Sequence, residues 1–295
     1  MSRDDAHVLA DILLKAGIRE VDILGGEPML VPWMKDFIKY ITDSDITLNI
    51  STNGSLPDVV KDFTEIRTDL MNIGFSVHGF SKTHNSLTMA DNFSNAVTGI
   101  RRTIEAGKNP IVKSTLMQEN KNEIYELVLY LKEIGVKRYY LLHEDIIGRK
   151  QYTDCFSFPE FWEYYCKLRS DLEGILDIGF VAASGFFKYG IQTPGRCDAG
   201  LTKIALLPDG SAFPCNLFFG FDEFHLGNIL IDGIEKIWSN PILERFRKYD
   251  VNRCSFTGCK HFMTCTGGCP AHSYFFHHSF HTSDPRCMAN SFSVK

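Results

Sequence analysis

Cysteine dominates the chemistry that this sequence could perform. Nine cysteines occur among 295 residues, and seven of them lie between Cys197 and Cys287. The N-terminal stretch MSRDDAHVLADILLKAGI carries acids and no uninterrupted apolar run, so we expect no signal peptide and a reducing, cytoplasmic compartment. There, clustered cysteines indicate metal or redox chemistry more often than disulfides. The two outlying residues, Cys155 and Cys166, are predicted to be small buried residues.

The seven clustered thiols are predicted to form a metal module. Cys197 and Cys215 flank the segments KIALL and SAFPC, which are predicted to pair as a hairpin around Pro208-Asp209-Gly210. The other five lie in a stretch too rich in glycine and cysteine for a packed helix: Cys254, Cys259, Cys265, Cys269 and Cys287. Iron–sulfur clusters and structural zinc both take cysteine thiolates, and the spacing favours neither.

The remaining polar residues carry no clear catalytic signature. The histidines near the end of the module are expected to be surface or loop residues: His272, His277, His278 and His281. Glu144 and Asp145 are expected to be ordinary solvated loop carboxylates.

The first half of the chain alternates between strand and helix patterns. Short apolar segments predict strands at 20–24, 46–50, 71–77, 111–117 and 136–142, with a helix between each pair. A further helix precedes them over residues 1–16, and Ser2 and Asp5 are placed to form its capping box. This alternation predicts a parallel sheet with right-handed crossovers. Five strands are too few for a closed eight-stranded barrel, so we expect an open one.

Glycine and small polar residues gather where the predicted strands end. GGEP (25–28) and STNG (51–54) follow the first two strands, SVHG (76–79) straddles the end of the third, and GRK (148–150) lies past the last. Active sites of parallel α/β barrels lie at the carboxyl ends of the strands. The sequence therefore predicts a site on this rim.

The chain is expected to have three parts. Residues 1–150 form the strand and helix domain, residues 151–196 a bridging helical segment, and residues 197–290 the cysteine module. We place the boundary between Tyr189 and Cys197, where TPGR interrupts the pattern. The net charge of −5 argues against nucleic-acid binding, and no 18-residue apolar run predicts a membrane span.

Together these motifs resemble the radical S-adenosylmethionine (SAM) enzymes that carry a C-terminal SPASM domain. GGEP after one strand, STNG after the next and a seven-cysteine module containing CTGGCP carry the resemblance over residues 1–290. PDG before FPC and the pair Ile237-Trp238 add to it. The resemblance implies a partial, open TIM-like (β/α) barrel that lacks its first strand, followed by a small cysteine-rich α+β SPASM domain.

The resemblance also implies the ligands of each cofactor. The residues implied to contact SAM are Gly25, Gly26, Glu27, Pro28, Ser51, Thr52, Asn53 and Ser76. Cys197, Cys215 and Cys269 would hold a first auxiliary [4Fe–4S] cluster, and Cys254, Cys259, Cys265 and Cys287 a second. Glu27 would bind the SAM ammonium group, and Gly25 and Gly26 would let the backbone approach it.

The implied activity is modification of a peptide or protein. SAM would be cleaved to a 5′-deoxyadenosyl radical that abstracts a hydrogen atom from the substrate. An external donor such as a flavodoxin or a ferredoxin would supply electrons.

The sequence departs from the family at its start. No CxxxCxxC loop, which holds the SAM-binding [4Fe–4S] cluster, occurs in the 295 residues. We expect the chain to be an inactive, N-terminally truncated copy, with SAM and that third cluster bound only by the full-length parent. Lys203 stands where some members have a fourth cysteine, and Thr88 where some have an arginine.

Two alternatives remain open. A degenerate, non-catalytic iron–sulfur protein would bind a peptide or relay electrons. A zinc module on an inert barrel would hold metal without acid-labile sulfide.

Overall fold

The computed structural model describes residues 1–63, 66, 69–147, 155–187, 195–248 and 254–287, and it divides into two compact units. The barrel unit comprises residues 2–144 and 163–181, and the cysteine-rich unit comprises Met1, residues 145–162 and residues 182–295. Two predictions fall outside the described residues: the rim segment at 148–150 and most of the predicted boundary at 189–197. The predicted domain limits themselves stay a prediction.

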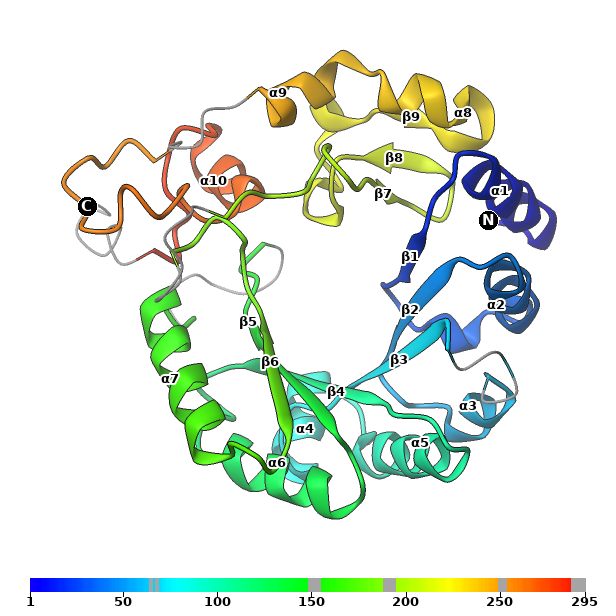
Figure 1. Cartoon of the computed structure of the whole chain (residues 1–295), viewed down its shortest axis with the longest axis vertical. Helices are drawn as coiled ribbons and strands as arrows, with labels where there is room; N and C mark the ends of the chain where they lie inside the picture. The colour runs from blue at the N-terminus through cyan, green and yellow to red at the C-terminus, as the bar shows by residue number, and fades with distance from the viewer. Residues whose placement is uncertain (64–65, 67–68, 148–154, 188–194, 249–253, 288–295) are drawn as a thin grey trace. The chain divides into compact units, whose positions relative to one another are not determined.

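The barrel unit is built on one parallel sheet. Its strands are β1 (Glu20–Ile23), β2 (Thr47–Thr52), β3 (Met71–Ser76), β4 (Ile111–Leu116), β5 (Arg138–His143) and β6 (Asp177–Val181). They lie in sequence order and every neighbouring pair is parallel (Figure 1). The open, TIM-like parallel architecture is therefore confirmed.

The predicted number of five strands is wrong, because β6 adds a sixth. It lies inside the segment predicted to be a helical bridge, and it pairs with β5 from Arg138↔Asp177 to Leu142↔Val181. Its sequence, DIGFV, buries only Ile178 fully. A five-residue strand with so little apolar periodicity gives a weak signal.

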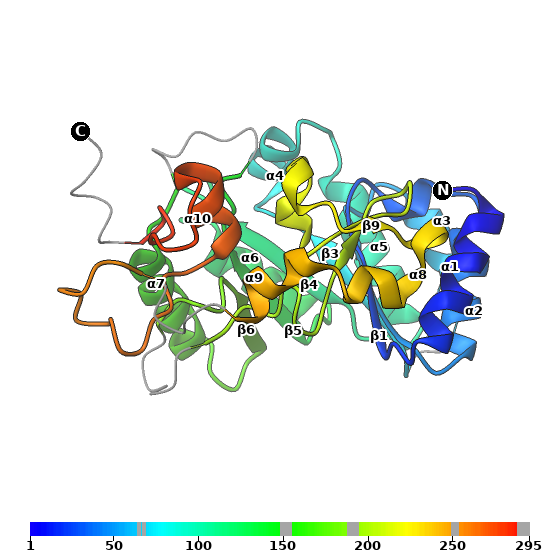
Figure 2. The same ribbon diagram turned by 90° about the horizontal axis from the view of Figure 1, so that it is seen from above.

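Helices connect the strands along the chain. They are α1 (Arg3–Lys15), α2 (Met34–Asp43), α3 (Pro57–Phe63), α4 (Ser81–Thr88), α5 (Phe93–Glu105), α6 (Ile124–Glu133) and α7 (Phe158–Asp171). The predicted capping box of α1 is present: Ser2 Oγ accepts from the Asp5 N–H, and Asp5 accepts from the Ser2 N–H. Helices α1 and α2 lie side by side in both views (Figures 1 and 2). In the part of the chain described, no helix has the length and apolar character needed to cross a bilayer.

The two faces of the sheet differ in chemistry. Ile50, Phe75 and Val112 are buried on the face that packs against the helices, and Phe75 lies so close to α5 that a Cβ at Gly99 would stand 2.9 Å from its ring. The alternate residues occupy the opposite face, which we call the inner face. On β2 to β5 it carries mainly polar side chains: Thr47, Asn49, Ser51, Asn72, Ser76, Lys113, Thr115, Arg138 and Tyr140.

The cysteine-rich unit has its own small sheet and core. Strands β7 (Ala205–Leu206), β8 (Ser211–Phe213) and β9 (Gly227–Asn228) are antiparallel, and β7 and β8 form the predicted hairpin. Its helices are α8 (Ile229–Trp238), α9 (Glu244–Arg247) and α10 (Pro270–His277). The core is aromatic: the rings of Phe224 and Phe246 lie 4.5 and 5.2 Å from that of Phe218.

Gly54, at the end of the STNG loop, provides a test of this packing. Its φ is +72°, and a Cβ there would stand 2.7 Å from the Ala96 Cα of α5. Gly54→Ala should therefore lower the free energy of unfolding of the barrel unit for two reasons. A non-glycine residue in a left-handed conformation costs about 1–2 kcal/mol, and overpacking against α5 costs a further amount of about 1–3 kcal/mol. Gly17 is the matched control: its φ is +70°, with no atom within 4 Å of an added Cβ. Equal losses for Gly17→Ala and Gly54→Ala in urea denaturation would contradict the packing.

Candidate active site and cluster-binding module

Glu27 joins the two predicted SAM loops on the rim. Its Oε1 accepts hydrogen bonds from the Met29 N–H (3.1 Å) and the Thr52 hydroxyl (2.7 Å), and its Oε2 accepts one from the Asn53 N–H (2.7 Å). The carboxylate thus bridges the loops that follow β1 and β2. The predicted residues 25–28 and 51–53 are brought together at one edge of the sheet.

Gly25 and Gly26 stand beside this bridge in conformations that favour glycine. Their φ angles are +78° and +52°, and no atom of the described residues beyond their own chain neighbours lies within 4 Å of an added Cβ at either position. The space next to this backbone is open, as a ligand-approach role requires. Pro28 opens a short 3₁₀ turn (Pro28–Leu30) and is buried.

Ser51 and Ser76 lie on the inner face, next to a residue that the sequence analysis missed. Lys113 on β4 is the cross-strand partner of Ser76, and its Nζ donates to Ser51 Oγ at 2.9 Å. The signal was present in the strand sequence IVKSTL, where Lys113 takes a position that alternates with buried residues.

A histidine pair follows β3: His78 lies in the segment SVHG and His84 lies on α4. The Thr115 N–H donates to His78 Nδ1 (3.2 Å), which leaves the proton on Nε2 of the neutral ring. The main-chain N–H of His78 donates to His84 Nδ1 (3.1 Å), and the two rings lie 5.9 Å apart. The Asn120 amide donates to the carbonyls of His78 and Thr115 at 2.7 and 2.8 Å. Burial, and next the His84 charge, lower the pKa of His78 from 6.5 to about 4.

The thiols of the predicted first cluster share one environment. Cys197, Cys215 and Cys269 all pack on the aromatic core of the cysteine-rich unit. Burial, with a smaller contribution from the Cys197 thiolate, raises the pKa of the Cys215 and Cys269 thiols. The Lys203 ammonium lies close enough to lower the pKa of Cys215 in part, so a positive charge sits where a fourth cysteine was considered.

Three thiols of the predicted second cluster also form a group. Burial raises the pKa of Cys265, and the nearby Cys254 and Cys259 add to that rise. Two of these sulfurs accept a hydrogen bond from the main-chain N–H two residues later in the chain. The Gly267 N–H donates to Cys265 Sγ (3.3 Å), and the His261 N–H donates to Cys259 Sγ (3.4 Å). Such N–H donors stabilise thiolates and cluster sulfurs.

In the described residues, neither group of thiols forms a complete metal site. Within the described ranges, no three cysteine, histidine or carboxylate groups converge at metal-ligand distance. Cys287, the remaining predicted ligand, donates its main-chain N–H to the Asp284 carbonyl (2.9 Å).

A buried ion pair supports Cys269. Asp284 accepts from Arg286 Nε (3.1 Å) and Nη2 (2.8 Å), and their side chains are 0% and 1% exposed. The Asp284 carboxylate also accepts the Cys269 N–H at 2.9 Å. Arg286 Nη1 reaches Asp145 at 3.0 Å, and His272 Nε2 accepts the Ile146 N–H at 3.1 Å.

Several expectations about these polar residues are wrong. His272 is fully buried because α10 packs it against this ion pair, whereas His277, His278 and His281 are exposed as predicted. Glu144 is buried, and Asp145 is ion-paired although its side chain is 53% exposed. Cys166 is exposed on α7 and Cys155 is half-buried.

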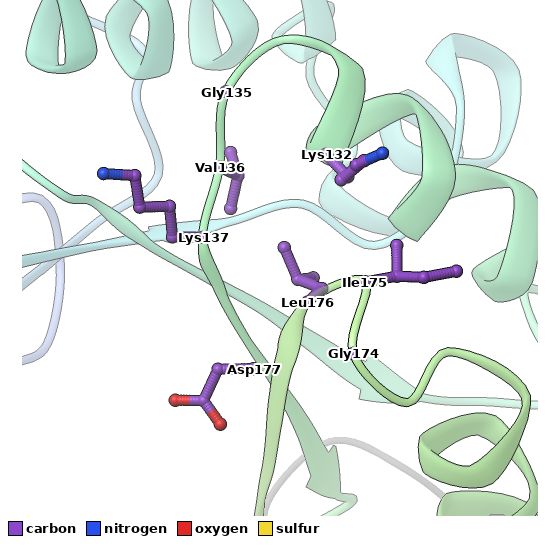
Figure 3. Close-up of a pocket in the computed structure, with 8 residues that line it drawn as sticks. All are labelled: Lys132, Gly135, Val136, Lys137, Gly174, Ile175, Leu176 and Asp177. Atoms are coloured by element: carbon purple, nitrogen blue, oxygen red, sulfur yellow. The ribbon is translucent and has the colours of Figure 1, made fainter.

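One depression lies away from the rim. It has a volume of about 480 Å³ and is lined by Lys132, Gly135, Val136, Lys137, Gly174, Ile175, Leu176 and Asp177 (Figure 3). These residues surround the amino ends of β5 and β6, and Lys132 and Lys137 point in different directions (Figure 3). Parallel α/β folds bind ligands at the other end of the strands, so we assign no site here.

Comparison with known families assigns both parts of the chain. Residues 1–131 match the sequence model of the radical SAM superfamily, and residues 197–266 match that of an iron–sulfur cluster-binding domain, SPASM. The chain therefore belongs to the radical SAM proteins that carry a SPASM domain. These families bind SAM and iron–sulfur clusters, which favours iron over the zinc alternative.

Its curated relatives include two named biosynthetic proteins. The chain is 24% identical to the antilisterial bacteriocin subtilosin biosynthesis protein AlbA of Bacillus subtilis, over 84% of this chain and 57% of AlbA. It is 24% identical to the mycofactocin maturase MftC of Mycobacterium tuberculosis, over 95% of this chain and 73% of MftC. The chain thus spans little more than half the length of AlbA.

Solved structures show the same fold. Streptococcus suis SuiB bound to its precursor peptide SuiA has a TM-score of 0.78 at 18% identity, covering 98% of this chain and 69% of SuiB. The protein anSMEcpe, with bound SAM and the Kp18Cys peptide, has a TM-score of 0.73 at 17% identity, covering 99% and 87%.

The buried pair of Asp284 and Arg286 yields a stability prediction. Arg286→Leu leaves a fully buried carboxylate without its cation and should lower the free energy of unfolding of the cysteine-rich unit by about 3–5 kcal/mol. The control is Arg3→Leu, which breaks the exposed ion pair with Asp36 and should change little. Urea denaturation of the metal-free protein measures both. A small loss for Arg286→Leu would show that the pair is dispensable.

His78 yields a pH prediction. Its folded pKa lies below the unfolded value, so its contribution to stability is full above pH 6.5 and is lost as the pH falls toward 4. Lowering the pH from 7.5 to 5 should therefore remove at most about 2 kcal/mol through this group. His78→Gln should flatten the pH dependence, whereas His277→Gln, at an exposed position, should not. Identical slopes for wild type and His78→Gln would refute the assignment.

Proposed function

We propose that this chain is part of a radical SAM enzyme that modifies a peptide or protein substrate. The observation that carries the proposal is the Glu27 bridge between the first two rim loops, in a chain that also holds two separate groups of thiols. The similarity to AlbA, a bacteriocin biosynthesis protein, and to MftC, a maturase, supports a peptide substrate.

In such an enzyme, bound SAM supplies the 5′-deoxyadenosyl radical that removes a hydrogen atom from the substrate. The rim residues of this chain would bind and orient it. Three hydrogen bonds fix the Glu27 carboxylate, and its remaining lone-pair capacity would accept the SAM ammonium group. Gly25 and Gly26 would give the ligand access to the backbone, and Pro28, Ser51, Thr52, Asn53 and Ser76 would complete the contact surface.

The thiol groups would hold two auxiliary [4Fe–4S] clusters. Cys197, Cys215 and Cys269 would ligate the first, which leaves one iron for the substrate, water or another side chain. Cys254, Cys259, Cys265 and Cys287 would ligate the second. An external donor such as a flavodoxin or a ferredoxin would supply the electrons.

The residues of this chain do not fit the third, SAM-binding cluster, because the 295 residues contain no CxxxCxxC loop. We therefore derive no radical step from this chain itself. The same observation supports the second candidate, a non-catalytic iron–sulfur protein that binds a peptide or relays electrons. The DNA sequence upstream of codon 1 separates the two: an in-frame CxxxCxxC there favours the enzyme, and a stop codon without it favours the non-catalytic protein.

Anaerobic reconstitution with iron and sulfide tests the cluster assignment. The wild-type chain should take up about eight iron and about eight sulfide, the content of two [4Fe–4S] clusters, and absorb near 400 nm. Cys215→Ala and Cys259→Ala should each lose about half of the iron, because each removes a ligand from a different group. Cys166→Ala, at an exposed position outside both groups, is the control. Zinc uptake without acid-labile sulfide would contradict the proposal.

A further inference from the structure

The inner face of the barrel sheet carries an ordered polar layer. Asn49 on β2 donates to Glu20 (2.5 Å) and Asp22 (2.7 Å) on β1, and it accepts from Asn72 on β3 (2.9 Å). These hydrogen bonds connect side chains on three neighbouring strands, β1, β2 and β3. The two carboxylates on β1, Glu20 and Asp22, are thus hydrogen-bonded to Asn49 within the layer.

Lys113 occupies the middle of the layer, in an unusual position. Its side chain starts on β4, crosses β3 and donates to Ser51 Oγ on β2 at 2.9 Å. The crossing requires Gly74, since a Cβ there would stand 2.8 Å from Lys113 Cε and 2.9 Å from Nζ. The lysine therefore lies flat against the sheet, with its ammonium group held beside the predicted SAM residue Ser51.

The ammonium group is incompletely compensated. It can donate three hydrogen bonds, and among the described residues it makes one, to a neutral hydroxyl. Asp22 is near enough to act on it electrostatically, yet no carboxylate in the described part of the chain lies within 4 Å of Nζ. Burial lowers the pKa of Lys113, and Asp22 opposes that effect. A partly buried ammonium group with one partner is stabilised by a contacting anion.

The surroundings select a small monoanion. Glu20 and Asp22 on the same face repel a dianion such as a phosphate monoester. Arg138, the other cation on the inner face of β4 and β5, lies at the amino end of β5, where it donates to the Asn109 carbonyl. A single lysine with the Ser51 hydroxyl beside it matches one carboxylate in charge.

We propose that the Lys113 ammonium group binds a carboxylate of the ligand that occupies the inner face of the barrel. The inference rests on the proposed function and deepens it, because it names the chemical group that the site recognises. Two sources present this group: the amino-acid carboxylate of SAM, and an acidic residue or the C-terminus of the peptide substrate. Lys113 is in either case a binding residue, and Gly74 is the residue that gives it room.

Binding of four small probes to wild-type and variant chains tests the proposal. Acetyl-glutamate methylamide and acetyl-glutamine methylamide differ only in the side-chain carboxylate. S-adenosylhomocysteine and 5′-methylthioadenosine differ by the amino-acid group. The Lys113 ¹³Cε–¹Hε NMR signal, assigned by its loss in Lys113→Arg, reports occupancy, and isothermal titration gives the affinities.

Lys113→Met should weaken binding of at least one carboxylate probe by tenfold or more, and Lys113→Arg should restore part of it. The neutral partner of that probe should bind wild type and Lys113→Met equally. Loss for the glutamate probe identifies the substrate as the source, and loss for S-adenosylhomocysteine identifies SAM. Lys39→Met, which removes an exposed lysine paired with Asp43 on α2, is the control.

The proposal is overturned if no carboxylate probe changes affinity by more than twofold in Lys113→Met, or if each carboxylate probe binds no better than its neutral partner. Circular dichroism checks that the variant is folded. Iron content after reconstitution should be the same in Lys113→Met as in wild type. Failed reconstitution would therefore count against the proposed function, and lost Lys113 dependence against this inference alone.

Discussion

One carboxylate holds the ligand-facing edge of the barrel unit together. β1 and β2 run parallel, so their carboxyl ends meet at one edge, but the loops that leave them share no backbone ladder. Glu27 supplies the missing connection by accepting from the Thr52 hydroxyl and the Asn53 amide. The glycine backbone before it and the serine and asparagine after β2 therefore present a single surface.

The cysteine-rich unit is organised differently, around a buried aromatic core and one buried ion pair. The aromatic core collects three thiols on its surface, and the Asp284–Arg286 pair fixes the amide of Cys269 where α10 begins. Backbone amides already point at the sulfurs of Cys259 and Cys265. Hydrogen bonds from the main chain therefore define the surroundings of several of these thiols.

Much of the fold and part of the site could be predicted from the sequence, since local patterns report them. Strand and helix alternation predicted the parallel sheet, and the turn Pro208–Gly210 predicted the hairpin. What escaped depends on contacts between distant segments. Strand β6 is recognisable only by its pairing with β5, and the burial of His272 only by its packing on Arg286. Lys113 looked like an ordinary strand residue because its partner, Ser51, lies 62 positions away.

Glycine in the middle of a strand usually weakens a sheet, yet two strands of this barrel contain one where a neighbour needs room. Lys113 lies across Gly74, and the Tyr140 ring lies over Gly179, where a Cβ would stand 2.5 Å from Cε1. These two long side chains leave β4 and β5 in opposite directions and stay flat against the wall. A methyl group at either glycine would turn the neighbouring side chain upright, into the space that a ligand would use. The positions of the Lys113 and Tyr140 side chains on the inner face are therefore set by two glycines that lie beneath them.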